Sequence, residues 1–567
     1  MKVAIISINA KNVHKAVAPW CLKAYAEREG FDGEIEVIEA NVNEQIGEVV
    51  GRIYNSKPDV AAFGCYIWNI EYVQKVVEMV RKLLPKVTVV FGGPEMTGSE
   101  EKDKFADYII QGAGEEPFFE LLMSLKNILS EDCLADAIIR HQPNGSRGGT
   151  LTPESAKKDL LCNFDCVRAA KNRPYGSAHI RHCIVHETAP IIWQCHAEAG
   201  CFSFADYPTP YTDDYFKSFA TDQISDIANR LIYYESTRGC PFSCSYCLSG
   251  NGVVGTGVLD RLQSMSNAKK PKSQLPRAVE DSRLYETNIA STRTPVTCIS
   301  LTRVKRDLVM FIAHGAKCVK FVDRTFNADR VRAKEILKFA GELDTDCVFH
   351  FEVAADLFDT ELLNVISKLP HGRVQFEIGI QSTNPKTLAA IDRKTDISLA
   401  LKNIKKLTGF GNCHIHVDLI AALPHETIES FAKGFDKCIE ARPHHLQLGF
   451  LKLLKSTKLR AEADKYGIVY ADFPPYEAYK TKTMSYDDIL RLKKVEGVVK
   501  RFWNRGGFRA VIEQGIDKVG SALVFFYGLA SYIESQNKYG GGADVRISVR
   551  NAEIVLEEYV KELGTRN

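Results

Sequence analysis

Apolar runs alternate with helix-like stretches along the first 125 residues. Five short runs predict buried strands: Val3–Ile8, Ile35–Ile38, Val60–Cys65, Val87–Phe91 and Tyr108–Gln111. Helix-like stretches such as Ala16–Glu29 and Glu71–Leu84 lie between them. Strand–helix alternation at this spacing is typical of a parallel, doubly wound sheet. Residues 1–125 are therefore predicted to form an α/β domain of the Rossmann-like kind.

A second alternation occupies residues 231–455. Its six strand candidates are Leu231–Glu235, Val319–Asp323, Val348–Ala354, Val374–Gly379, His414–Ile420 and Leu446–Leu451. Because helical patterns separate most of them, they predict a partial (β/α)6 barrel of the TIM type, with its active site at the carboxyl ends of the strands. Residues 456–567 are mainly helical in pattern, for example over Tyr486–Arg501, and predict a helical C-terminal domain.

Two segments have weak periodicity. Residues 126–230 are predicted to be a linker with an insertion that contains several cysteines: Cys162, Cys166, Cys183, Cys195 and Cys201. Their spacing matches no metal motif, so incidental thiols are favoured over an auxiliary cluster or a zinc site. Residues 251–299 form a polar insertion in the barrel, and both a disordered loop and a substrate-covering loop fit that composition.

Composition narrows the class of protein. The 567 residues carry a net charge of +2, so no strong field indicates nucleic acid or an anionic membrane as a partner. No apolar run has transmembrane length, and the N-terminus lacks the order of a signal peptide. The 16 cysteines are spread over a long chain, unlike those of a small secreted disulfide scaffold. These features predict a protein of the reducing cytoplasm.

Three cysteines directly follow the first strand of the predicted barrel. Cys240, Cys244 and Cys247 have the spacing C-x3-C-x2-C. Three thiolates can hold three irons of a [4Fe–4S] cluster and leave the fourth iron open to a ligand. A structural zinc site needs a fourth ligand, and no second cysteine pair lies at a suitable distance. The three cysteines are therefore predicted to bind a catalytic iron–sulfur cluster.

This motif and its place resemble the radical S-adenosylmethionine (SAM) family. The resemblance implies that the open iron binds SAM and that reductive cleavage of SAM yields a 5′-deoxyadenosyl radical. The run Glu377–Ser382 resembles the family's ribose-contacting strand, so Glu377, Gln381 and Ser382 are implied SAM contacts. The Gly-Gly-Glu pattern that binds the SAM amino group is missing, and Asp323 or Thr325 is the candidate substitute.

Polar and glycine-bearing loops follow the strands of the N-terminal domain. Their order resembles the cobalamin-binding domain that precedes the core of many radical SAM enzymes. The implied cofactor contacts are Asn9, Gly64, Gly92, Gly93, Gly112 and Gly114. The Asp-x-His-x-x-Gly pattern that supplies a cobalt ligand elsewhere is absent, so His14 is not expected to bind cobalt. A flavodoxin-like domain with another ligand, or none, is the alternative.

Two barrel strands also carry spaced polar pairs, His350 with Glu352 and His414 with His416. A metal site is conceivable there, and packing in a polar barrel interior is the favoured interpretation.

The whole chain resembles cobalamin-type radical SAM proteins with a helical tail. The resemblance implies methyl transfer to an unactivated carbon, with an electron donor such as flavodoxin or ferredoxin as partner. Two alternatives stay open: a radical SAM enzyme without cobalamin whose N-terminal domain binds substrate, and a non-catalytic iron–sulfur scaffold or sensor. No motif names the substrate.

Overall fold

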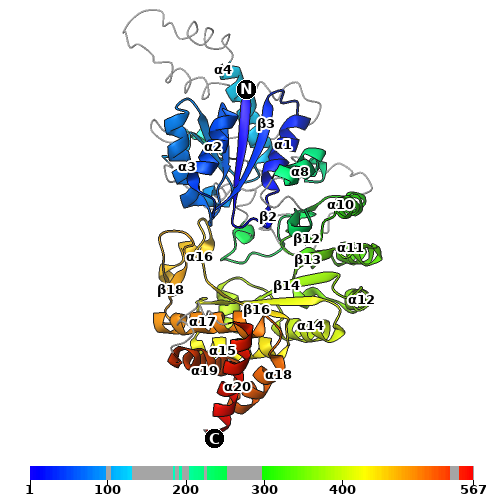
Figure 1. The fold of residues 1–567 in the computed structure, drawn as a ribbon, viewed down its shortest axis with the longest axis vertical. Coiled ribbons are helices and arrows are strands. Elements are labelled where there is room, and N and C mark those ends of the chain that lie inside the picture. Colours follow the sequence, from blue (N-terminus) through cyan, green and yellow to red (C-terminus); the bar gives the residue numbers. More distant parts are fainter. Residues whose placement is uncertain are drawn as a thin grey trace, which may run out of the picture.

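The computed structural model describes residues 1–97, 104–129, 183–184, 191–194, 204–221, 227–251, 296–536 and 548–565. Three layers follow one another along its long axis: an N-terminal sheet domain, a barrel and a C-terminal group of helices (Figure 1). Most of the two predicted insertions lies outside the described residues, including Cys162, Cys166, Cys195 and Cys201.

The N-terminal domain is a parallel, doubly wound sheet, as predicted. Its strands β1 (Lys2–Asn9), β3 (Glu34–Asn41), β4 (Val60–Gly64), β5 (Thr88–Gly92) and β6 (Tyr108–Gln111) lie in the order β3-β1-β4-β5-β6. Alternate residues of β1 enter separate cores on its two faces, because successive side chains of a strand point in opposite directions. Helices α2 (Ile46–Ser56) and α3 (Ile70–Leu83) cover one face. Helices α1 (Ala18–Arg28) and α4 (Glu115–Leu129) cover the other.

Two short strands from the segment 126–230 extend this sheet. Strand β8 (Ile191–Gln194) pairs in parallel with β6, and β7 (Cys183–Ile184) pairs with β8 in the antiparallel direction. The N-terminal sheet therefore has seven strands, two of them from residues that the sequence pattern placed in the linker.

The barrel contains the six predicted strands, all parallel: β9 (Leu231–Tyr234), β12 (Cys318–Phe321), β13 (Val348–Val353), β14 (Val374–Gln381), β15 (His414–Ala421) and β16 (His445–Phe450). The helices around them are α10 (Leu301–Ala313), α11 (Arg330–Glu342), α12 (Thr360–Ile366), α13 (Pro385–Ala390), α14 (Ile397–Phe410) and α15 (Ile428–Glu440). In β14 every second residue is buried in the apolar core, so the residues between them face the lumen.

The N-terminal domain contributes a seventh strand to the barrel sheet. Strand β2 (His14–Lys15) leaves the end of β1 and pairs in parallel with β9. The Lys15 ammonium is completely buried and lies 2.8 Å from Glu39 Oε1 of β3. Trp20 Nε1 and Asn9 Nδ2 each donate to the Glu39 carboxylate at 3.2 Å. A buried ion pair thus joins the two domains, and it engages Asn9, which the sequence had suggested as a cofactor contact.

The C-terminal helices α17 (Tyr486–Val498), α18 (Arg509–Val519), α19 (Ala522–Ser535) and α20 (Val549–Thr565) pack beneath the barrel (Figure 1). A π-helical turn (Val499–Trp503) follows α17, and Asn504 after it bonds both backbone groups of Leu446 in β16. The last barrel strand is therefore covered by the C-terminal region. Among the described residues no single helix is long and apolar enough to span a membrane, although the bent pair α18–α19 reaches that length and apolarity together.

Candidate active site

The cysteine loop is fixed at the carboxyl end of β9. Gly239 opens the loop with φ +102°, a conformation that favours glycine. Ser245 N donates to Ile391 O at 3.0 Å, and Leu459 N donates to Ser245 O at 2.9 Å. Cys247 N also donates to Cys244 O at 3.1 Å. Backbone bonds from two sides therefore hold the three thiols in one compact turn, a donor set that fits a [4Fe–4S] cluster with one open iron.

Asp323 supports this loop from below. Its Oδ1 accepts hydrogen bonds from Ser236 N (2.7 Å) and Thr237 N (2.9 Å), and its Oδ2 accepts from Ser236 Oγ at 2.5 Å. The residue is completely buried. The carboxylate of Asp323, a candidate contact of the SAM amino group, is thus engaged by the backbone that leads into the cysteine loop. Burial raises the pKa of Asp323 to about 6, against the hydrogen bonds from Ser236 and Thr237 that favour the ionised form.

An Asp323→Asn variant should remove one pH dependence of stability. The pKa of Asp323 is about 6 in the folded protein, above the ordinary value of 3.8 expected in the unfolded chain. Between about pH 4 and 6 the folded protein therefore keeps a proton on Asp323 that the unfolded chain has released. The wild type should therefore lose stability relative to the variant as pH rises through this window. Urea-unfolding midpoints of the cluster-free protein at pH 4, 5, 6 and 7 measure the difference, and a constant difference would contradict the assignment.

Arg393 contacts the cysteine loop from the far side of the barrel. Its Nη1 donates to Cys244 Sγ at 3.7 Å and to the Tyr246 hydroxyl at 3.3 Å, and its Nη2 donates to Gly379 O of β14. Burial raises the pKa of the Cys244 thiol, and the Arg393 charge opposes that rise. Burial also raises the pKa of Cys240, whose Sγ lies 3.9 Å from Thr325 Oγ1. Arg393 therefore favours the thiolate form that binds iron.

Replacing Arg393 with methionine should shift Cys244 ionisation to still higher pH. The wild-type pKa already lies above the ordinary 9.0, and the variant loses the opposing positive charge. Alkylation of Cys244 by iodoacetamide in the cluster-free protein, followed by peptide mass spectrometry across pH, gives the midpoint. Cys298 alkylation in the same samples serves as the internal control. An unchanged Cys244 midpoint would show that the guanidinium exerts no charge effect on the thiol.

The end of β14 presents one open acceptor. The strand is irregular between Gly379 and Gln381, and Gln381 adopts φ +67°. A Cβ at Gly379 would lie 2.2 Å from Gln381 Nε2, so a larger residue there would displace the end of the Gln381 side chain. Gln381 Oε1 is buried and has no hydrogen-bond partner among the described residues. Gln381 thus keeps the capacity to bind a ligand that the sequence resemblance implied.

Ser382 has a structural position instead. Its hydroxyl donates to the Glu426 carboxylate and accepts from Asn384 N at 3.0 Å. The residue is buried, and Glu426 also accepts from Ser430 Oγ. The hydroxyl predicted to contact SAM is therefore engaged in linking the ends of β14 and β15.

Glu377 lies deeper in the lumen than the cysteine loop, two residues before Gly379. Lys320 Nζ and His350 Nε2 each lie 2.9 Å from its Oε2. Burial alone would raise the pKa of Glu377, but these two neighbours hold it below the usual range. Burial and the Glu377 charge raise the pKa of Glu352 to about 6, against the charge of Lys320. Glu377, predicted as a SAM contact, is thus part of a charged cluster in the barrel interior.

The glycine loops of the N-terminal domain lie at the carboxyl edge of its sheet, which points toward the barrel (Figure 1). Gly93 has φ +106°, and a Cβ there would lie 2.7 Å from Cys65 O. A Cβ at Gly64 would lie 3.3 Å from Tyr66 Cε2, whereas a Cβ at Gly92 would have no neighbouring atom closer than 3.8 Å. Gly112 adopts φ +87°. A Cβ at Gly114 would lie 3.2 Å from Leu22 Cδ2. Close approach of the Cys65 backbone thus requires glycine at position 93, and neighbouring side chains leave little room for a Cβ at Gly64 and Gly114.

Two aromatic rings add a flat apolar surface at the same edge. Tyr66 and Trp68 stack with ring centroids 4.4 Å apart, and Trp68 is 49% exposed. His14 is not available there, because its Nδ1 shares a 2.6 Å hydrogen bond with the Tyr233 hydroxyl and its ring stacks on that residue. Burial lowers the pKa of His14. The edge therefore fits a corrin whose cobalt takes no imidazole from the protein at this position.

Ion pairs fix this edge over the barrel mouth. Arg238, two residues before Cys240, lies 2.9 Å from Glu115 at the start of α4. Lys455 Nζ lies 3.0 Å from the buried Glu95, and Ser456 Oγ donates to Thr97 O at 2.7 Å. The cysteine loop and the glycine loops thus face each other across one interface. Sequence reasoning missed Arg238, Arg393 and Lys320, since no local pattern marks their distant partners.

Three protein families match successive parts of the chain. Residues 3–122 match the B12 binding domain, residues 234–438 the radical SAM superfamily, and residues 464–560 a protein family of unknown function, DUF4080. The first two matches confirm the predicted arrangement of a cobalamin-binding domain ahead of a radical SAM barrel. They also confirm the predicted cofactor set for these domains: cobalamin, SAM and a [4Fe–4S] cluster.

Two curated enzymes are similar over most of the chain. The cobalamin-dependent radical SAM methyltransferase TokK of Streptomyces tokunonensis is 25% identical over 429 residues, which cover 73% of this chain and 50% of that protein. The 2-(S-pantetheinyl)-carbapenam-3-carboxylate methyltransferase of Streptantibioticus cattleyicolor is 25% identical over 460 residues, which cover 78% of this chain and 54% of that protein. The chain thus spans about half the length of these relatives.

Solved structures share the fold at low sequence identity. One is TsrM from Kitasatospora setae, a radical SAM methyltransferase solved with cobalamin and a [4Fe–4S] cluster bound. It superposes with a TM-score of 0.52 and 14% sequence identity, and the match covers 84% of this chain and 78% of TsrM. The cobalamin-dependent SAM radical enzyme OxsB superposes with a TM-score of 0.55 and 12% sequence identity. The match covers 100% of this chain and 80% of OxsB. These likenesses confirm the fold class.

Proposed function

We propose that this chain is a cobalamin-dependent radical SAM methyltransferase that acts on an unactivated carbon of its substrate. The observation that carries the proposal is the placement of the three-cysteine loop opposite the glycine loops of the B12-type domain, joined by the Arg238–Glu115 ion pair at 2.9 Å. A cluster on one side and a corrin on the other would both reach a substrate in the barrel mouth. The two curated methyltransferases similar to this chain support the reaction class.

When bound, the cluster supplies one electron to SAM and the cobalamin carries the methyl group. Cys240, Cys244 and Cys247 would hold the cluster, and Arg393 would favour the thiolate of Cys244. Gln381 Oε1, buried and without a hydrogen-bond partner among the described residues, would accept a hydrogen bond from SAM. The Tyr66–Trp68 pair would support the flat face of the corrin and exclude water from it.

The test uses protein purified without oxygen and reconstituted with iron, sulfide and cobalamin. With SAM and a chemical reductant in place of a flavodoxin-type or ferredoxin-type donor, we expect 5′-deoxyadenosine and a corrinoid that co-purifies with the chain. Cells that contain or lack the protein, grown with methyl-labelled methionine, should differ in one labelled metabolite. That metabolite identifies the substrate by mass spectrometry.

Two outcomes would favour the other functions. SAM cleavage by a protein whose extract contains no corrinoid after cobalamin supplementation would indicate a radical SAM enzyme whose N-terminal domain binds substrate. An intact cluster without any 5′-deoxyadenosine would indicate a scaffold or sensor. Either result would reject the methyltransferase proposal.

A further inference from the structure

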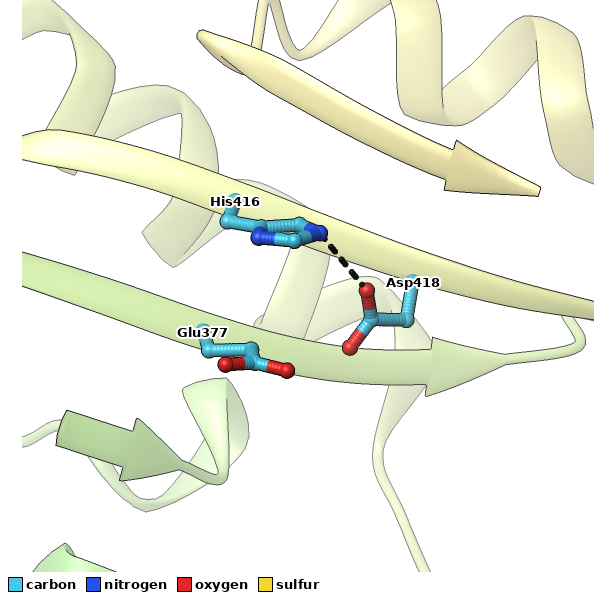
Figure 2. A group of neighbouring side chains, drawn as sticks. All are labelled: Glu377, His416 and Asp418. Atoms are coloured by element: carbon cyan, nitrogen blue, oxygen red, sulfur yellow. Dashed lines mark ion pairs between the residues drawn. The ribbon is translucent and has the colours of Figure 1, made fainter. Parts of the chain in front are cut away.

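Three metal-ligating side chains converge inside the barrel, outside the cysteine loop. Glu377 of β14 and His416 and Asp418 of β15 each offer one donor atom, and these atoms all lie within 4.8 Å of one another (Figure 2). Backbone register explains the convergence. Glu377 is paired with His416, and Asp418 lies two residues further along β15 on the same face. The group is therefore built by adjacent strands of the sheet.

The converging atoms have unmet bonding capacity. His416 Nε2 and Asp418 Oδ1 lie 2.9 Å apart, yet both are buried without a hydrogen bond among the described residues. His350 Nε2, in a residue only 9% exposed, lies 2.9 Å from Glu377 and also lacks a hydrogen bond. Buried polar atoms are nearly always partnered in native proteins. An ion bound between these ligands would satisfy the facing imidazole and carboxylate.

Charge also favours a cation here. Three carboxylates face this part of the lumen: Glu352, Glu377 and Asp418. Among the described lysines and arginines, Lys320 is the one within ion-pair distance of them, 2.9 Å from Glu377 and 3.9 Å from Glu352. With the histidines counted as neutral, the cluster carries two uncompensated negative charges. Buried charges of this kind are normally paired or coordinate a metal.

We propose that Glu377, His416 and Asp418 bind one divalent first-row metal ion of the Mn²⁺ or Fe²⁺ kind in the barrel lumen. One imidazole and two carboxylates form a ligand set that suits these ions. Glu377 and His416 are paired with each other, and Asp418 is paired with Gly379, the residue whose carbonyl accepts from Arg393, so the ion would lie between these two levels of the sheet. Its remaining coordination positions would suit a substrate carboxylate or hydroxyl oxygen. None of these three ligands is one of the cysteines that would hold the cluster in the proposed function.

Mn²⁺ is the probe of choice, because hard ligands bind it in preference to thiols. Free Mn²⁺ is counted by its electron paramagnetic resonance signal during titration of the reconstituted full-length protein with its cluster oxidised. We expect one bound Mn²⁺ per chain in the wild type. Asp418→Asn and His416→Gln should each weaken binding by at least about tenfold, since loss of an outer-sphere partner alone costs about that much.

The matched control is His414→Gln, two residues before His416 on the same strand and tilted against His444 with ring centroids 5.0 Å apart. It should bind Mn²⁺ as the wild type does. Iron and sulfide contents of each variant show whether its cluster is intact, so a loss of Mn²⁺ binding can be distinguished from a loss of the cluster. Titration of the cluster-free chain should rank the variants in the same order of Mn²⁺ affinity. Absence of Mn²⁺ binding by the wild type, or equal binding by all four proteins, would overturn the proposal whether or not the chain cleaves SAM.

Discussion

Replacing Cys240 with alanine is expected to lower SAM cleavage by more than about a hundredfold and to remove most of the cluster iron. Loss of a partner outside the first coordination shell of a metal commonly costs about 10–100-fold, and Cys240 would be a direct ligand. Cys244 and Cys247 should behave alike, because one turn positions all three thiols. Iron analysis, absorbance near 400 nm and 5′-deoxyadenosine formation after anaerobic reconstitution measure the effect.

Cys298 is the matched control for that experiment. It lies in the two-residue strand β11 (Thr297–Cys298), which pairs with β10 (Thr237–Arg238) directly before the cysteine loop. It is partly buried, as Cys240 is. Cys298→Ala should keep its iron and its SAM cleavage. If Cys240→Ala kept full SAM cleavage, the radical SAM mechanism would be wrong.

The largest effect on stability is expected from Lys15→Met. This change leaves Glu39 as a buried carboxylate without its cation, and breaking a buried pair from one side costs about 3–5 kcal/mol. The Lys15 ammonium also lies 4.8 Å from the centre of the Phe219 ring, an attraction that methionine cannot replace. Urea unfolding followed by near-ultraviolet circular dichroism should show a clearly lower midpoint.

Two further variants define the cause. Lys23→Met removes a cation whose partner Asp214 is largely exposed, so we expect a change below about 1 kcal/mol. Lys15→Met combined with Glu39→Gln removes both charges but keeps an acceptor for Trp20 Nε1, and it should recover part of the loss. If Lys15→Met unfolded at the same urea concentration as the wild type, the Lys15–Glu39 ion pair would contribute nothing to the stability of the protein.

The strands of both sheets could be predicted because each is a short apolar run between turn signals. The predicted Val374–Gly379, for example, is observed as Val374–Gln381. The extension by β7 and β8 could not be predicted, since four residues such as Ile191–Gln194 become a strand only through pairing with β6. Pairing of this kind depends on contacts between residues far apart in the chain.

The cysteine loop was equally predictable, because its ligands are adjacent in sequence. Its supports were not. Arg393 is 149 residues from Cys244, and Asp323 is 87 residues from Ser236, whose backbone N–H donates to it. Glu377 and Ser382 match the family pattern in sequence, yet one lies among lumen charges and the other bonds Glu426. Strand ends identify the neighbourhood of a site, while side-chain direction depends on packing.

The two-residue strand β2 has a consequence for dividing this protein. It covers the outer side of β9, the strand that leads into the cysteine loop. A truncated protein without the first domain would present the unpaired backbone groups of β9 to solvent, and such a row readily pairs with another molecule. We therefore expect the isolated barrel to aggregate. Exchange of this domain between related proteins would succeed only if the incoming domain also supplies a strand that pairs with β9 as His14–Lys15 does.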